Sequence, residues 1–235
     1  MNFDVMTSTL KERFSNPIRL ATILGLFLFP IPIALVDPRP NSSAFFHPLI
    51  AVAIASGILG LDFSTGVLAL VFTRPIRRST YALSKWAAVT LTAIALSSVQ
   101  LIAVDAILRV RHDAGIPDLL SARLAERVVA AAGTSAVVLL LSALGSGLSD
   151  LAVWGLACIA AQTCRMVGLV NHDDFWLRFG EGLLFLLAPG YGSGSGASLL
   201  PFPALALAVF LTIAALGLSV WVLERREITY SEIRA

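Results

Sequence analysis

The stretch FPALALAVFLTIAALGLSVWVL, residues 202–223, contains no charged residue and decides the fold class. The hydrocarbon core of a bilayer is roughly 30 Å thick, so an α-helix crosses it with about 20 predominantly apolar residues. A segment of this length and composition therefore predicts a membrane-spanning helix. Stretches of similar character recur along the whole chain of 235 residues.

These stretches predict an all-α polytopic membrane protein with six transmembrane helices in a single membrane domain, residues 18–223. Hydrophobic residues make up 57% of the chain and charged residues 14%, with a mean hydropathy of +0.84. A soluble domain of this size would need more polar surface to cover its core. The predicted spans are Ile18–Val36, Phe45–Leu61, Trp86–Leu108, Val128–Leu148, Leu151–Val170 and Phe202–Leu223.

Residues 1–17 predict an amphipathic helix that precedes the first span. Phe3, Met6, Leu10 and Phe14 recur at steps of three and four residues, and Pro17 ends the pattern. A helix of this kind beside a span lies in the headgroup plane of the membrane. It either anchors the terminus or transfers force to the span, and the sequence leaves both interpretations open.

A short apolar piece, Leu183–Ala188, lies between the last two predicted spans. It is too short to cross a bilayer and predicts a re-entrant segment on the outward side, before the sixth span. A glycine- and serine-rich run, residues 189–198, follows it and predicts a loose loop.

The distribution of charge predicts the orientation in the membrane. Basic residues gather in segments 11–19, 74–85 and 225–234, which share one side if the chain alternates across the bilayer. Because positive charge is enriched in cytoplasmic loops, both termini, including the tail 224–235, are expected in the cytoplasm of a bacterial-type inner membrane. A net charge of +2 is too small to indicate a nucleic-acid partner.

The loop Asp62–Lys85, between the second and third spans, carries the strongest functional signal. Gly66 can begin a turn, the apolar run 67–72 can form a short helix, and Pro75 would end that helix. The pattern predicts a short helix held parallel to the inner surface of the membrane. On charge alone, the same cluster is also explained as a topology anchor. Its polar and basic members are Thr73, Arg74, Arg77 and Arg78.

The order of residues in this loop resembles that of type-2 ABC transporter permeases. There an acidic residue, Gly-Thr-Leu, a hydrophobic run, Pro-Val-Ser-Arg and Gly-Lys follow one another, and the matching residues here are Asp62, Gly66, Pro75, Arg78 and Lys85. The amphipathic start, the six spans, the re-entrant segment and the charged tail are also similar to that family. The resemblance implies a coupling helix that sits in a groove of a separate ATPase subunit. The coupling residues that it implies are Asp62, Gly66, Thr73, Arg74, Pro75, Arg77 and Arg78.

The nucleotide chemistry is expected on another chain. No Gly-x-x-x-x-Gly-Lys-Ser/Thr phosphate loop is present, so this chain cannot cradle nucleotide phosphates. We therefore expect no catalytic, cofactor-binding or metal-binding residue here, with ATP and Mg²⁺ on two copies of a partner ATPase. Six spans are few for a complete pathway, so a second permease subunit, identical or related, is expected as well. The sequence does not identify the exported substrate.

Other functions have weaker support in the sequence. A non-transporting membrane anchor that recruits partner proteins is the main alternative. A secondary transporter would need charged, broken helices at mid-membrane depth, which the sequence does not predict. Pro189-Gly190-Tyr191-Gly192 resembles a potassium filter only superficially, and a serine protease would need a histidine within a span.

Some single polar residues also admit a functional interpretation. Gln100, Gln162 and Arg165 fall within predicted spans, where a polar side chain is costly and faces protein or water. A place on a substrate path is the minority interpretation of these three. His172, Asp173 and Asp174 lack a partner cluster for a metal site, and a solvated outer edge explains them better.

Overall fold

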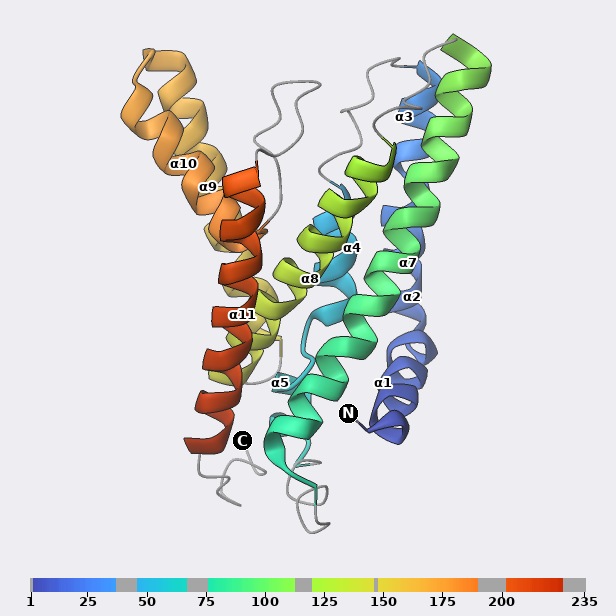
Figure 1. Ribbon diagram of the computed structural model, residues 1–235, viewed down its shortest axis with the longest axis vertical. Coiled ribbons are helices and arrows are strands. Elements are labelled where there is room, and N and C mark those ends of the chain that lie inside the picture. Colours follow the sequence, from blue (N-terminus) through green and yellow to red (C-terminus); the bar gives the residue numbers. More distant parts are fainter. Residues whose placement is uncertain are drawn as a thin grey trace.

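The computed structural model describes residues 2–36, 46–66, 76–112, 120–145, 148–189 and 202–225. Within these ranges the protein is entirely helical, as the sequence predicts (Figure 1). The helices are α1 (Phe3–Ser15), α2 (Pro17–Leu28), α3 (Pro30–Val36), α4 (Phe46–Ala55), α5 (Gly60–Ser64), α7 (Arg78–His112), α8 (Leu120–Leu144), α9 (Ser149–Asn171), α10 (Asp174–Leu187) and α11 (Phe202–Arg225).

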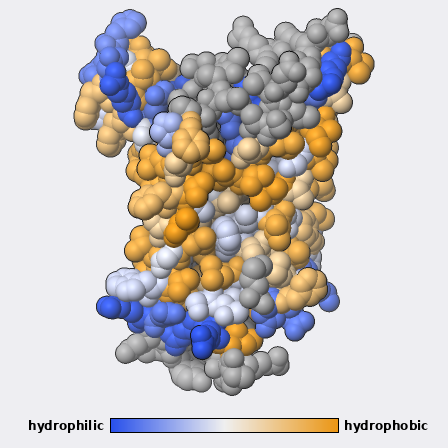
Figure 2. Space-filling model, in the orientation of Figure 1, coloured by the Kyte–Doolittle hydropathy of each residue, from blue (hydrophilic) through white to orange (hydrophobic). Residues whose placement is uncertain are grey.

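Four helices in the described part of the chain, α7, α8, α9 and α11, are long and apolar enough to cross a membrane. The bent pair α1–α2 would add a fifth if it formed one span. Figure 2 shows apolar side chains around the middle of the visible face and hydrophilic ones near both ends. These features indicate a membrane-embedded protein, whereas the predicted number of six spans stays a prediction.

The first predicted span, 18–36, is divided into two helices by the proline-rich sequence that begins at Pro30. Pro30 has no backbone N–H to donate to the carbonyl of Leu26, four residues earlier. The side-chain amide of Gln100, on α7, donates instead to the carbonyls of Leu26 at 3.1 Å and Phe27 at 2.9 Å. Gln100 is fully buried, and this contact assigns it a structural role.

The second predicted span, 45–61, is not a continuous helix either. Helix α4 ends at Ala55, residues 56–59 form turns, and α5 begins at Gly60. Gly57 has φ +66°, a left-handed conformation that interrupts the helix and that side chains with a Cβ rarely adopt. Residues 56–59 are called the α4–α5 break below. Neither this break nor the one at Pro30 is predicted from the sequence.

Helix α1 meets α2 at an angle of 86°. Asn16 separates them, and its side-chain oxygen accepts hydrogen bonds from the backbone N–H groups of Ile18 and Arg19, which caps α2. The side chains of α1 that are buried against the protein are Thr9 and Arg13. Of the apolar stripe, Phe3 is 75% exposed and Phe14 is also exposed, whereas Met6 and Leu10 are half-buried.

Helices α4, α7 and α8 surround the main hydrophobic core, and α11 packs along α8. Helix α10 packs antiparallel to α9 and is longer than the predicted apolar piece 183–188, because its polar start is also helical (Figure 1). Asp173 caps α10, and His172 ends α9 in a left-handed conformation. Gly180 allows the close packing, since a Cβ there would lie 2.6 Å from the carbonyl oxygen of Ala161.

Candidate functional site

The predicted coupling residues that the structure describes flank the loop between α5 and α7. Asp62 lies on α5, and Gly66, with φ +71°, forms the turn after it. Arg77 is exposed just before α7, and Arg78 is the first residue of that helix. Thr73, Arg74, Pro75 and the whole predicted short helix, 67–72, lie outside the described residues, as do the loop at 190–198 and the tail from residue 226.

Three distant parts of the chain meet at this end of the molecule. The backbone N–H of Asn2 donates to the Ser84 hydroxyl at 2.7 Å, which places the N-terminus beside the start of α7. The guanidinium of Arg78 donates to the carbonyl of Leu223 at 3.1 Å, which places the end of α11 there too. Asn2, the C-terminal end of α11 and both flanks of the 67–75 loop therefore share one end of the helix bundle (Figure 1).

Asp62 and Lys85, which match the family pattern, are in direct contact. The Lys85 ammonium lies 2.5 Å from the Asp62 carboxylate, and the Tyr81 hydroxyl donates to the same oxygen at 2.8 Å. Asp62 is 5% exposed and Lys85 is 3% exposed. The carboxylate of Asp62 therefore joins α5 to α7 across the base of the loop, and it points into the protein.

The α4–α5 break collects positive charge on its carbonyl oxygens. Arg13 donates to the carbonyls of Ser56 at 2.5 Å and Gly57 at 3.1 Å, and Lys85 donates to that of Ile58 at 3.1 Å. Arg19 adds a second bond to the Ser56 carbonyl at 3.3 Å. These carbonyls follow the C-terminal end of α4, where the helix dipole is negative, so cations are stabilised there.

Two backbone N–H groups of the break and that of Gly60, which begins α5, are satisfied by side chains from the α8–α9 hairpin, whereas those of Ser56 and Ile58 donate to carbonyls of α4. The Asp150 carboxylate accepts from the N–H of Gly57 at 2.6 Å. The Ser142 hydroxyl accepts from Leu59 at 2.9 Å and from Gly60 at 2.8 Å. Irregular backbone at membrane depth is tolerated only where its polar groups find partners within the protein or in water. The break meets this condition through side chains from α1, α2, α7, α8 and α9.

The break combines charges of both signs. Arg13 is fully buried, and burial lowers its pKa to about 10, with the nearby charge of Arg19 acting in the same direction. Arg13 nevertheless stays protonated at neutral pH, because a pKa of about 10 lies well above 7. In a secondary transporter, such carbonyls coordinate the driving ion. Here they bind arginine and lysine side chains of the chain itself.

The sequence does not indicate that the side chains that bind the backbone of the break lie close together. Arg13 lies off the apolar stripe of residues 1–17, Ser142 is one of many small residues in its helix, and Asp150 belongs to a tight turn. Each of them binds backbone groups that only a broken helix exposes. The one available signal is the pair Ser56-Gly57 inside an otherwise apolar run.

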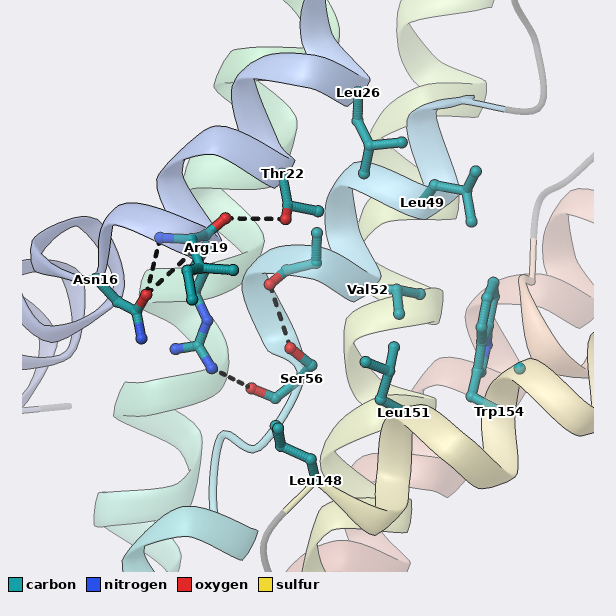
Figure 3. Close-up of a pocket in the computed structure, with 13 residues that line it drawn as sticks. Asn16, Arg19, Thr22, Leu26, Leu49, Val52, Ser56, Leu148, Leu151 and Trp154 are labelled. Atoms are coloured by element: carbon teal, nitrogen blue, oxygen red, sulfur yellow. Dashed lines mark hydrogen bonds between the residues drawn. The ribbon is translucent and has the colours of Figure 1, made fainter.

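A cavity of about 560 Å³ adjoins the break between α2, α4 and α9 (Figure 3). Asn16, Arg19, Thr22 and Ser56 are its polar lining residues, and Figure 3 shows the Arg19 side chain pointing toward Ser56. The opposite walls are apolar, with Leu26 and Leu49 on one side and Trp154 on another.

The remaining polar residues singled out in the sequence have structural surroundings. No group of three or more His, Cys, Asp or Glu side chains able to hold a metal ion occurs among the described residues. His172 and Asp173 take part in the turn between α9 and α10. Arg165 is half-buried on α9, where a Cβ at Gly180 of the facing helix would approach its backbone N–H.

The chain was compared with known proteins. It matches no protein-family model, and no curated protein is similar to it in sequence.

Proposed function

We propose that this chain is the transmembrane permease subunit of an ATP-binding cassette exporter. Its end with both termini faces the cytoplasm of a bacterial-type inner membrane, and the 67–75 loop binds a separate ATPase subunit. Two permease subunits, identical or related, and two ATPase subunits form the transporter, and ATP and Mg²⁺ bind to the ATPase. The proposal rests on the residue pattern from Asp62 to Lys85 and gains support from the surroundings of that loop.

The structural feature that supports the proposal most directly is the attachment of both flanks of the loop to the helix bundle. On one side, Asp62 is bonded to Lys85 and Tyr81. On the other, Arg78 is bonded to the end of α11. A force applied to the loop would therefore act on α5, α7 and α11 together. Because packed helices are stiff, they would move as rigid bodies. A small displacement of the loop would then become a larger movement of the helices.

The α4–α5 break extends this connection toward the membrane. Lys85 bonds both to Asp62, at the base of the loop, and to the Ile58 carbonyl within the break. Movement of α7 would therefore shift Lys85 and change its hydrogen bond to the break that separates α4 from α5. In this proposal, Asp62 and Lys85 transmit force inside the permease, whereas Arg74 and Arg77 contact the ATPase.

Helices α1 and α10 fit the same arrangement. With α1 at 86° to α2, the exposed Phe3 and Phe14 of its apolar stripe would rest on the cytoplasmic leaflet. Helix α10 begins at the opposite end of the bundle (Figure 1), and in this proposal it enters the membrane from the outer side and turns back. The pairs α2–α3 and α4–α5 supply the two remaining spans.

Co-purification tests the proposal. A tagged permease is expressed together with candidate ATPase subunits, and ATPase recovery is compared for wild type, Arg77→Glu and Arg74→Glu. We expect charge reversal to reduce recovery at least tenfold. Arg178→Glu, an exposed arginine on α10, is the matched control and should leave recovery unchanged. The proposal fails if no ATPase binds or if all variants behave alike. ATPase binding without ATP-driven transport in proteoliposomes would favour the membrane anchor instead.

A further inference from the structure

We propose that the cavity between α2, α4 and α9 binds an anionic phospholipid of the surrounding membrane, with its phosphate at Arg19 and an acyl chain against Trp154. The inference is independent of the transport function proposed above. It depends on the shape, the charge and the position of the cavity.

Arg19 forms no ion pair within 4 Å with a described residue, although the charges of Glu12 and Asp150 act on it from a greater distance. Its guanidinium makes one hydrogen bond to a described residue, from Nη2 to the Ser56 carbonyl at 3.3 Å. This bond leaves the other N–H groups of the guanidinium for an anion. The guanidinium fork matches the oxygens of a phosphate, and its bonds to phosphate are stronger than those to neutral acceptors.

The position of Arg19 corresponds to the headgroup level of a bilayer. It lies in the first turn of α2, directly after the elbow at which α1 turns through 86°. If α1 lies along the surface of the membrane, the start of α2 is where the chain enters it. Phosphate groups of the lipid are found at this depth.

The walls of the cavity change from polar to apolar in the direction of the bilayer centre. Leu26 lies seven residues after Arg19 on α2, and Leu49, on α4, lies seven residues before Ser56, which directly follows that helix. At 1.5 Å per residue, each apolar side chain is about 10 Å farther along its helix than the polar one. An acyl chain attached to a phosphate at Arg19 would follow this direction (Figure 3).

The volume of the cavity, about 560 Å³, is typical of small-molecule sites, which measure about 300–1,000 Å³. It can hold a headgroup and part of one acyl chain. Leu151 and Trp154 contribute an apolar wall from α9. A free anion would leave this apolar part unfilled, so the cavity favours an amphiphile over a phosphate ion.

Fluorescence quenching by brominated lipids tests the inference, because Trp154 lies in the wall of the cavity. The purified chain is placed in nanodiscs that contain brominated phosphatidylglycerol or brominated phosphatidylcholine with the same acyl chains. Subtraction of the signal of Trp154→Phe isolates the contribution of Trp154 from that of the other tryptophans. We expect Trp154 to prefer phosphatidylglycerol about fivefold, the effect of one cationic side chain at a membrane surface.

Arg19→Gln should abolish this preference, since glutamine can still donate to Ser56 but carries no charge. Arg178→Gln is the matched control and should retain it. Leu151→Phe narrows the apolar part while Arg19 stays intact, and it should weaken the quenching by both lipids. Circular dichroism establishes that each variant is folded. Equal quenching by both lipids in the wild type, or an unchanged preference in Arg19→Gln, would overturn the inference.

Discussion

The Lys85 ammonium and the Asp62 carboxylate form a buried ion pair at 2.5 Å that connects the two flanks of the 67–75 loop. The residues are 23 positions apart, and their side chains are 4% and 7% exposed. Both also bind neighbouring groups: Lys85 donates to the Ile58 carbonyl, and Asp62 accepts from the Tyr81 hydroxyl. The pair thus belongs to the same network as the α4–α5 break.

Removal of one member of this pair should destabilise the protein strongly. Lys85→Met leaves the Asp62 carboxylate buried without its counter-charge, which costs about 3–5 kcal/mol. The double variant Asp62→Leu, Lys85→Met removes both charges and should recover much of this loss. Thermal unfolding in detergent measures both effects. Lys11→Met, at an exposed position of α1, is the control. If the loss of stability in the double variant equals the sum of the losses in Lys85→Met and Asp62→Leu alone, the two side chains do not interact directly.

A second prediction concerns Gly57 in the α4–α5 break. Gly57→Ala places a Cβ in a left-handed residue, 2.9 Å from the Leu61 side chain and 3.1 Å from that of Leu148. The backbone conformation alone costs about 1–2 kcal/mol, and the contacts add to it. The melting temperature should therefore fall. Gly155→Ala is the matched control: a Cβ there meets nothing within 4 Å, and alanine favours the helix, so stability should hold or rise slightly.

A third prediction concerns the attachment of α1. Arg13→Gln removes the charged fork that holds α1 to the carbonyls of Ser56 and Gly57. We expect faster hydrogen–deuterium exchange in residues 3–15, because α1 then keeps the bond at Asn2 and the packing of Val5 and Thr9 but loses its charged attachment. Lys11→Gln, on the exposed side of the same helix, should exchange like the wild type. If α1 is protected equally in both variants, Arg13 is not its main attachment.

The sequence predicts the long helices well and the breaks poorly. Residues 202–223 and 151–170 are predicted as spans, and the structure has helices at Phe202–Arg225 and Ser149–Asn171. Apolar periodicity and length suffice for these, because the bilayer sets the length of a span. The break at residues 56–59 lies in an equally apolar run. It depends on partners far along the chain, such as Asp150, 93 residues from Gly57, and no local pattern reveals them.

The candidate site shows the same division. The pattern that contains Asp62, Gly66 and Lys85 is visible in the sequence, since it occupies one short segment. The direct bond between Asp62 and Lys85, and the convergence of Arg13 and Arg19 on Ser56, follow from the packing of separate helices. Sequence alone therefore indicates where the loop lies, but not which side chains connect it to the membrane helices.

A fourth prediction tests whether the buried side chain of Gln100, on α7, replaces the backbone hydrogen bond that α2 lacks at Pro30. Gln100→Leu removes the donors to the carbonyls of Leu26 and Phe27, and each unsatisfied buried carbonyl costs about 1–3 kcal/mol. Pro30→Ala restores a backbone N–H where the Leu26 carbonyl needs one. It should therefore recover part of the stability in the Gln100→Leu background, by allowing α2 to continue as a regular helix.

The matched control for that experiment is Pro32→Ala. Its restored N–H would serve the carbonyl of Leu28, which Gln100 does not contact. Thermal unfolding of the two single variants and the double variant gives the coupling between Gln100 and each proline. We expect coupling for Pro30 and none for Pro32. Equal coupling for both prolines would mean that Gln100 stabilises the bend as a whole, and that it does not replace one particular backbone hydrogen bond.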